Sequence, residues 1–182
     1  EFKSFKNKSD KDWFSELCFC ILAANSKQKT AEAIEKSLGP DKLLAIEQKE
    51  LAIFIRNNKH RFHNNKAQYI VEARGLYPIK EKIINLPESE ARSWLIKNVM
   101  GLGYKEASHF LRNTGSLSLA ILDRHILNLM EEHSLIQRPK TLTPKNYLEI
   151  EKVFRDIAKR LNVSSAKLDL MMWYLKTGEV LK

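Results

Sequence analysis

Cysteine, glycine and proline are scarce in this chain of 182 residues, which contains only 2, 6 and 5 of them. The two cysteines, Cys18 and Cys20, are too few for a disulfide scaffold and fit a reducing, cytoplasmic setting. They also exclude a four-cysteine zinc or iron–sulfur site within the chain. The low glycine and proline content argues against a β-sandwich full of tight turns. No apolar run approaches the ~20 residues of a membrane span, and no signal peptide opens the sequence, so no membrane partner is expected.

Acidic residues are outnumbered, because 22 Asp and Glu stand against 31 Lys and Arg, which gives a formal net charge of +9. A protein that neutralises phosphates needs such an excess of positive charge. Charge alone is a weak argument, since many basic proteins bind no nucleic acid. The length suits one globular unit or two small lobes, and is enough to bury a core.

Apolar residues recur at three- and four-residue spacing through nearly the whole chain, which predicts an all-α fold without a convincing strand. The pair Gly39-Pro40 is expected to end one helix, and Gly178 the last one. The expected helices cover about residues 13–22, 30–38, 43–57 (one or two helices), 65–74, 87–99, 104–113, 123–130, 144–161 and 166–176.

The most informative segment is VMGLGYKEAS, residues 99–108. Gly101 and Gly103 lie between two short helices and predict a tight hairpin that exposes backbone N–H groups. The N-terminus of the second helix lies beside these groups, so a phosphate could bind there without any side-chain charge. An ordinary turn between helices explains the glycines equally well.

The residues after the hairpin give a more specific signal. Lys105 stands on the first turn of the second helix, and 18 residues later Asp123 opens another helix in LDRH, residues 122–125. This combination resembles the helix-hairpin-helix DNA glycosylase superfamily. More narrowly, residues 103–113 and 119–125 resemble its archaeal-type 8-oxoguanine DNA glycosylase/AP lyase group.

The resemblance extends to both ends of the chain, because residues 17–25 resemble the group's first long helix and residues 168–175 its last. It implies a two-lobed all-α fold with the active site in the cleft between the lobes. One lobe would span residues 11–120 and contain the helix-hairpin-helix. The other would span 121–182, together with 1–10, and complete the lesion pocket.

The residue types fit glycosylase chemistry. A glycosylase that also cuts the strand needs an amine nucleophile, which Lys105 would supply if a helix N-terminus and neighbouring basic groups disfavour its ammonium form. Asp123 could stabilise positive charge on the sugar or orient the attacking group. Taken singly, Lys105 is one of many solvated lysines and Asp123 is a helix N-cap.

Recognition of the damaged base is expected from the last helix and the chain end. Trp173 and Asp169 lie one turn apart, so they can face one site, with Trp173 stacking on the flipped base and Asp169 reading its polar edge. By resemblance, the terminal carboxylate of Lys182 would accept from N7 of 8-oxoguanine. The alternatives are a core tryptophan, a surface carboxylate and a disordered terminus.

A basic stretch over residues 56–82, with a local charge of +5, suits contact with DNA. By resemblance, Arg61 would hydrogen-bond the orphaned cytosine and Phe62 would wedge into the base stack. Asn25 would probe the lesion gap, unless it only caps its helix. Such a stretch is otherwise a solvated surface.

The resemblance therefore implies base-excision repair of damaged double-stranded DNA, by a protein expected to be a monomer in a prokaryotic cytoplasm. No cofactor and no metal are expected. Val99-Met100-Gly101 stands where many relatives have Leu-Pro-Gly, and the iron–sulfur cysteines of another branch are absent. The alternatives are a glycosylase for another damaged base and a non-catalytic helix-hairpin-helix DNA-binding module.

Overall fold

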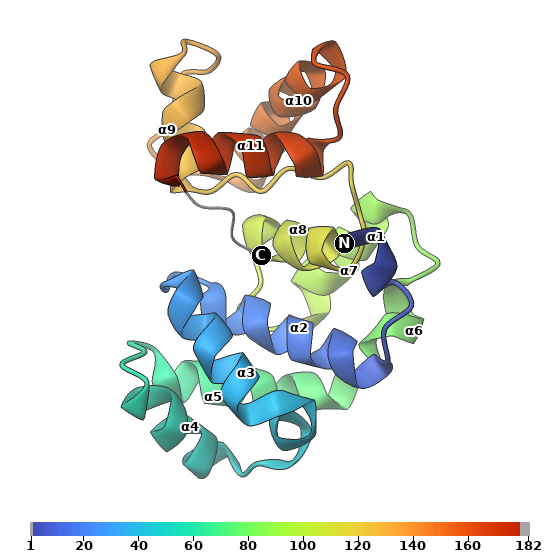
Figure 1. Ribbon diagram of the computed structural model, residues 1–182, viewed down its shortest axis with the longest axis vertical. Coiled ribbons are helices and arrows are strands. Elements are labelled where there is room, and N and C mark those ends of the chain that lie inside the picture. The colour runs from blue at the N-terminus through green and yellow to red at the C-terminus, as the bar shows by residue number, and fades with distance from the viewer. Residues whose placement is uncertain (1, 179–182) are drawn as a thin grey trace.

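The computed structural model describes residues 2–178, and these residues fold into helices and connecting loops without a strand (Figure 1). The all-α prediction is therefore confirmed. In the same range, none of the helices combines the length and apolar character that crossing a membrane requires. The helices are α1 (Phe2–Phe5), α2 (Asp10–Ala23), α3 (Gln28–Ala45), α4 (Gln48–Asn57), α5 (His63–Ala73), the 3₁₀ turn η1 (Arg74–Leu76), α6 (Ile79–Ile83), α7 (Glu88–Asn98), α8 (Tyr104–Asn113), α9 (Arg124–Glu132), α10 (Pro144–Arg160) and α11 (Ser165–Thr177).

Most helix ends lie where local sequence rules put them. Gly178 ends α11 in the left-handed conformation, at φ 72°, as expected for a glycine after the last turn. At Gly39-Pro40 the expected stop is a kink, because Gly39 (φ 68°, ψ 166°) breaks the helical path and a second helical segment continues to Ala45.

The buried apolar side chains form two separate cores, which make the two lobes. The first contains the apolar faces of α2 to α8 and the second those of α9 to α11, which lie together at the top of Figure 1. The buried residues of the first core end at Leu119, and those of the second begin at Ala120. The chain thus passes from one lobe to the other just before Asp123.

The N-terminal segment packs differently from the expectation, which joined residues 1–10 to the second lobe. Phe5 packs against the first core and meets Trp13 edge to face, with ring centroids 6.3 Å apart. Burying this aromatic ring against its nearest apolar neighbours in sequence brings α1 to the first lobe.

Cys18 and Cys20 are buried in the first core and form no disulfide with each other. Burial raises the pKa of Cys18, which keeps it protonated and unreactive. The interpretation of the cysteines as small buried apolar residues is therefore confirmed.

Candidate active site and nucleic-acid interface

The hairpin between α7 and α8 requires glycine at Gly101. Its φ of +86° lies in the left-handed region, and a Cβ there would lie 2.5 Å from Cδ2 of Tyr69 on α5. Gly103 is the N-cap of α8, and its N–H donates to Oε2 of Glu106 over 3.3 Å. Both glycines are exposed, but the carboxylate of Glu106 already accepts the Gly103 N–H that was expected to be available for a phosphate.

Lys105 lies on the first turn of α8, directly after the hairpin. Its side chain is 29% exposed, and Nζ lies 3.6 Å from Oε1 of Glu106. Lys105 is thus a partly buried lysine beside a helix N-terminus and a carboxylate, and its side chain is not fully solvated.

A second lysine, Lys66 on α5, lies close enough to interact electrostatically with this site. It is almost fully buried, and burial lowers its pKa to about 8, with Lys105 lowering the pKa further and Glu106 raising it. Lys66 lies within the basic stretch 56–82 that was expected to contact DNA, but its side chain packs inside the first lobe.

Asp123 is the N-cap of α9, as its structural alternative predicted. One carboxylate oxygen, Oδ1, accepts the backbone N–H groups of His125 (2.8 Å) and Ile126 (2.9 Å). This cap fixes the carboxylate at the point where the chain enters the second lobe.

Asp169 on α11 is buried, so it is not the surface carboxylate of the alternative interpretation. Burial raises its pKa to about 6, the Asp123 carboxylate raises it further, and Arg112 and Lys105 oppose both effects. The charges of Lys105 and Asp123 both act on Asp169, so the start of α8 and the start of α9 lie within electrostatic range of this carboxylate on α11.

Arg112 of α8 is the direct partner of Asp169, with Nη1 2.5 Å from Oδ2. The guanidinium also donates through Nε and Nη2 to Oδ1 of Asn113, whose amide donates to Glu16 of α2 over 2.6 Å. A buried polar chain thus runs from the first lobe into the second. Fixing Asp169 this way satisfies a buried charge that would otherwise be costly.

Trp173 lies one turn after Asp169 on α11 and is half-buried. The ring of His125, two residues after Asp123, meets it edge-on with centroids 4.9 Å apart. An aromatic surface therefore lies beside Asp123 and Asp169. Lys182, the other expected recognition residue, lies outside the described residues.

Arg61, Phe62 and Asn25 form a second group. Phe62 is 43% exposed, and the Arg61 guanidinium lies 5.3 Å from its ring centroid. Arg61 also donates through Nη2 to the backbone carbonyl of Asn25 over 3.1 Å. Asn25 is exposed and has a left-handed φ of 55°, while Ala24 is the C-cap of α2, so Asn25 lies just beyond the helix.

A buried histidine, His60, holds this group against α2. Its Nδ1 accepts the Phe62 N–H at 3.3 Å, so the ring proton is on Nε2, which donates to the Leu22 carbonyl at 2.8 Å. Burial lowers the pKa of His60, and Lys66 and Arg61 lower it further, which favours the neutral ring that this bonding needs.

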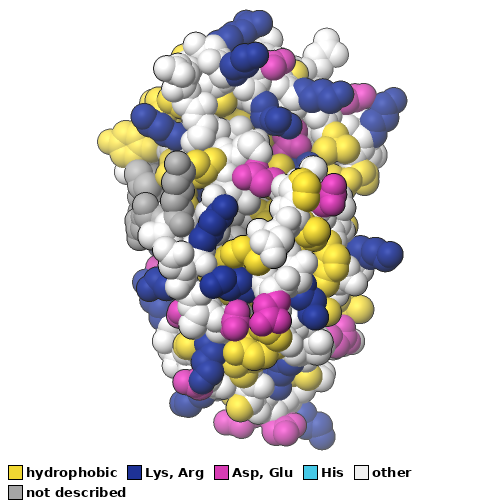
Figure 2. All heavy atoms as spheres, turned by 90° about the vertical axis from the view of Figure 1, so that its right-hand side faces the viewer, with side chains coloured by type: hydrophobic (Ala, Val, Ile, Leu, Met, Phe, Trp, Pro, Cys, Tyr) yellow, Lys and Arg dark blue, Asp and Glu magenta, His cyan; other side chains and the backbone are white. Residues whose placement is uncertain are grey.

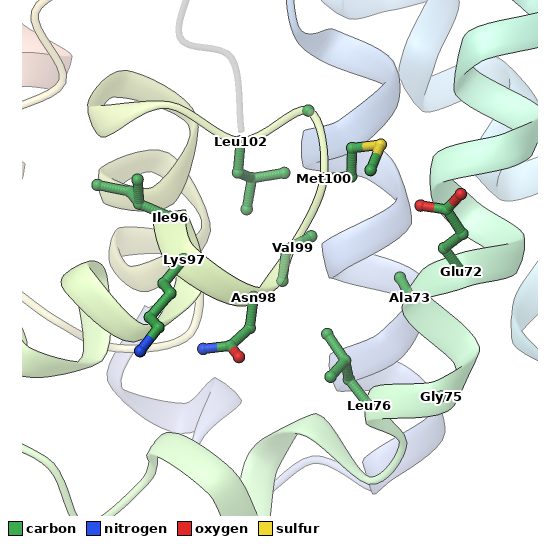
Figure 3. A pocket seen from close by; sticks show the side chains of 11 residues that line it. Glu72, Ala73, Gly75, Leu76, Ile96, Lys97, Asn98, Val99, Met100 and Leu102 are labelled. Carbon is green, nitrogen blue, oxygen red and sulfur yellow. The ribbon is translucent and has the colours of Figure 1, made fainter.

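The surface also contains two hollows, the first of which is bordered by Gly101 of the hairpin. One of about 480 Å³ lies beside the hairpin, where Figure 3 shows Met100 and Val99 facing α5 and η1. The other, of about 960 Å³, lies along α10 and the start of α11. Neither is lined by Lys105, Asp123 or Trp173. On the face in Figure 2, basic and acidic side chains are interspersed, so this face shows no continuous basic stripe.

Several residues of the site were not singled out from the sequence. Arg112 and Glu106 lie inside the quoted motif, and His125 follows Asp123 directly in the same turn, so proximity to the motif was the available signal. His60 directly precedes Arg61 and Phe62, so it had the same signal of proximity. Lys66 carried none, because a lysine in a basic stretch looks the same whether it is buried or exposed.

The hairpin between α7 and α8 lies in one lobe, and Lys105 and then Asp123 follow it in the chain, with Asp123 at the boundary to the other lobe. This arrangement is the helix-hairpin-helix fold of DNA glycosylases. The family model described as 8-oxoguanine DNA glycosylase matches residues 1–163. The chain therefore belongs to the 8-oxoguanine DNA glycosylase family.

Known relatives agree over the full chain. The 8-oxoguanine DNA glycosylase/AP lyase of Methanocaldococcus jannaschii is 49% identical, over 100% of this chain and 88% of that protein. The crystal structure of a glycosylase/lyase from the same organism, in complex with DNA containing 8-oxoguanine, matches with a TM-score of 0.96 and 48% identity, covering 100% of this chain and 88% of that one. The Thermotoga maritima 8-oxoguanine DNA glycosylase matches with a TM-score of 0.94, 40% identity and the same coverage.

Proposed function

We propose that this chain removes 8-oxoguanine from duplex DNA and then cleaves the strand, as a bifunctional DNA glycosylase and AP lyase. The observation that carries the proposal is that Lys105 directly follows the hairpin and that its charge and the charge of Asp123 both act on Asp169, in a member of this family. Its substrate would be the chromosome, which in a prokaryote lies in the cytoplasm.

In the proposed reaction Lys105 is the nucleophile. Its unprotonated amine attacks C1′ of the flipped nucleotide, the N-glycosidic bond breaks, and the base leaves with its electron pair and takes up a proton. Asp123 stabilises the positive charge that develops on the sugar. The amine and the opened sugar form a Schiff base, a proton is lost from C2′, and the 3′ phosphate leaves by β-elimination. Water then hydrolyses the Schiff base and regenerates Lys105.

The flipped base would be held by the second lobe. Trp173, with His125 against its ring, supplies the stacking surface, and Asp169 supplies a polar group that Arg112 holds in place. By the family resemblance, the terminal carboxylate of Lys182 is assigned as the acceptor for N7–H of 8-oxoguanine.

The rest of the duplex would contact the first lobe. The hairpin at Gly101 and Gly103 approaches a phosphate through its backbone, which needs Glu106 to release the Gly103 N–H. Phe62 would fill the gap left by the flipped base, Arg61 would bond to the opposite cytosine, and Asn25 would lie beside them.

Borohydride trapping tests the proposal directly. On duplex containing 8-oxoguanine opposite cytosine, the protein should form a covalent adduct with DNA, and Lys105→Gln should abolish both the adduct and strand cleavage. Lys145→Gln is the matched control, because Lys145 is a largely exposed lysine of α10. Binding without an adduct would favour the non-catalytic DNA-binding module. Unchanged strand cleavage by Lys105→Gln would show that Lys105 is not the nucleophile.

A panel of duplexes, each with a different damaged base, separates 8-oxoguanine from other substrates. Excision should be fastest on 8-oxoguanine, and faster excision of another base would favour the alternative glycosylase. Binding should also weaken steeply with salt, since phosphate contacts release counterions.

A further inference from the structure

A buried polar network joins the two lobes beside the candidate active site. Arg92 of α7 and Glu151 of α10 form a two-pronged ion pair, with Nη1–Oε1 at 2.6 Å and Nη2–Oε2 at 2.8 Å, and both side chains are about 95% buried. A buried ion pair does not by itself stabilise a fold, because removing both charges from water offsets their attraction. The position of this pair at the lobe boundary therefore calls for another explanation.

The second-lobe end of the network holds the segment that leads to Asp123. Oε1 of Glu151 accepts the N–H of Ala120 over 3.0 Å. The hydroxyl of Tyr147, also on α10, donates to the Ala120 carbonyl over 2.7 Å and accepts the Leu122 N–H at 3.3 Å. The backbone around Ile121 is neither helix nor strand, so these side chains satisfy polar groups that no regular structure pairs.

The Tyr147 hydroxyl also holds the backbone that directly precedes Asp123. The N–H of Asp123 donates to the Ile121 carbonyl over 2.9 Å, and both neighbours of Ile121 are bonded to Tyr147. Tyr147 is fully buried and burial raises its pKa, which keeps the hydroxyl protonated as a donor.

The first-lobe end of the network touches the residue before Lys105. Tyr104, the first residue of α8, packs on Tyr147 with ring centroids 5.2 Å apart, and the Arg92 guanidinium lies 5.2 Å from the Tyr104 ring. The network therefore contacts the chain next to Lys105 on one side and the chain leading to Asp123 on the other.

We infer that Tyr147 is a positioning residue, which with Arg92 and Glu151 sets the Asp123 carboxylate relative to Lys105 across the lobe boundary. This inference rests on the proposed function. Tyr147 touches neither DNA nor the reacting atoms in this scheme, and acts through the backbone of residues 120–123. Base excision depends on the Asp123 carboxylate facing the sugar, whereas β-elimination at an existing abasic site needs the Lys105 amine and no departing base.

Tyr147→Phe tests the inference, because it keeps the ring packed on Tyr104 and removes only the hydroxyl. Single-turnover excision of 8-oxoguanine should fall on the order of 10- to 100-fold, the effect of displacing a catalytic group by about 1 Å. Strand cleavage and borohydride trapping at a preformed abasic site should change less than about threefold, far below that displacement effect. Tyr77→Phe, on a partly exposed tyrosine of the first lobe, is the matched control for both reactions.

A double variant separates positioning from general weakening. If Tyr147 acts through Asp123, then adding Tyr147→Phe to Asp123→Asn should cause no further loss of excision. Parallel loss of excision and β-elimination in Tyr147→Phe, or full additivity in the double variant, would overturn the inference. If Tyr147→Phe does not fold, Glu151→Gln replaces it, because the amide oxygen can still accept the Ala120 N–H while the ion pair is lost, and the same split is expected.

Measurements on the wild-type protein distinguish a failure of the positioning role from a failure of the proposed function. Excision by the wild type together with no selective defect in the variant overturns the positioning role alone. A wild type that neither excises 8-oxoguanine nor is trapped on DNA overturns the proposed function, and the positioning role with it.

Discussion

Lys66 is a buried lysine without an ion-pair partner among residues 2–178, since none of their carboxylates lies within 4.0 Å of its Nζ. Its pKa is lowered from 10.5 to about 8 mainly by burial. At neutral pH Lys66 is therefore still protonated, and burying its ammonium group lowers the free energy of unfolding. Lys66→Met keeps the apolar stem and removes the charge, so we expect it to stabilise the protein at pH 7 by roughly 1 kcal/mol, because solvent near the ammonium group screens much of the cost of burying it.

The sign of the pH dependence is set by the lowered pKa. Between about pH 8 and 10.5 the unfolded chain binds more protons at Lys66 than the folded one, so this residue makes wild-type stability rise with pH in that range. The advantage of Lys66→Met should therefore shrink steadily from pH 8 to pH 10.

Urea unfolding followed by tryptophan fluorescence at pH 7, 8, 9 and 10 measures this difference. Comparing the variant with the wild type cancels other groups that titrate in the same range. Lys145→Met, on an exposed lysine, should change the free energy of unfolding by less than about 0.5 kcal/mol at every pH. A Lys66→Met advantage that does not vary with pH, or a loss of stability at pH 7, would refute the assignment of a strained buried ammonium.

Three further substitutions test the site. Gly101→Ala should destabilise the protein by about 1–3 kcal/mol in urea unfolding and weaken binding to duplex DNA in a fluorescence titration, because its Cβ meets Tyr69 at a left-handed φ. An unchanged unfolding curve would mean that the hairpin adjusts freely. Arg112→Met should cost about 3–5 kcal/mol by the same unfolding assay, because it leaves Asp169 buried without its partner, and a loss below 1 kcal/mol would count against that pairing. Phe62→Ala should alter stability by less than about 0.5 kcal/mol, since the ring is 43% exposed, but should slow single-turnover excision from duplex DNA, and equal rates would remove its role as a wedge.

Much of the local structure was predictable because its causes lie within a few residues. The hairpin, the start of α8 at Tyr104 and the Asp123 cap depend on glycine conformations and on hydrogen bonds that span two or three residues. The position of Lys105 on the first turn of α8 depends on the same local rules. The family resemblance added the fold and the roles expected of these residues.

The long-range ion pairs were not predictable, because nothing near Asp169 in the sequence indicates which residue it pairs with. Arg112 lies 57 residues away, and Glu151 lies 59 residues from Arg92. These bonds form only when the two lobes are brought together, and their geometry depends on the packing of both cores.

The amino-acid sequence by itself determined the helices, the hairpin and the order of its catalytic candidates, because helix periodicity, glycine conformation and capping act over one or two turns. Only the tertiary structure decided which charges are buried. Lys66 and Lys105 are both lysines of a basic chain, yet one packs inside the first lobe and the other remains partly open beside the hairpin. Burial depends on which distant helices cover a side chain, and that is a property of the folded chain as a whole.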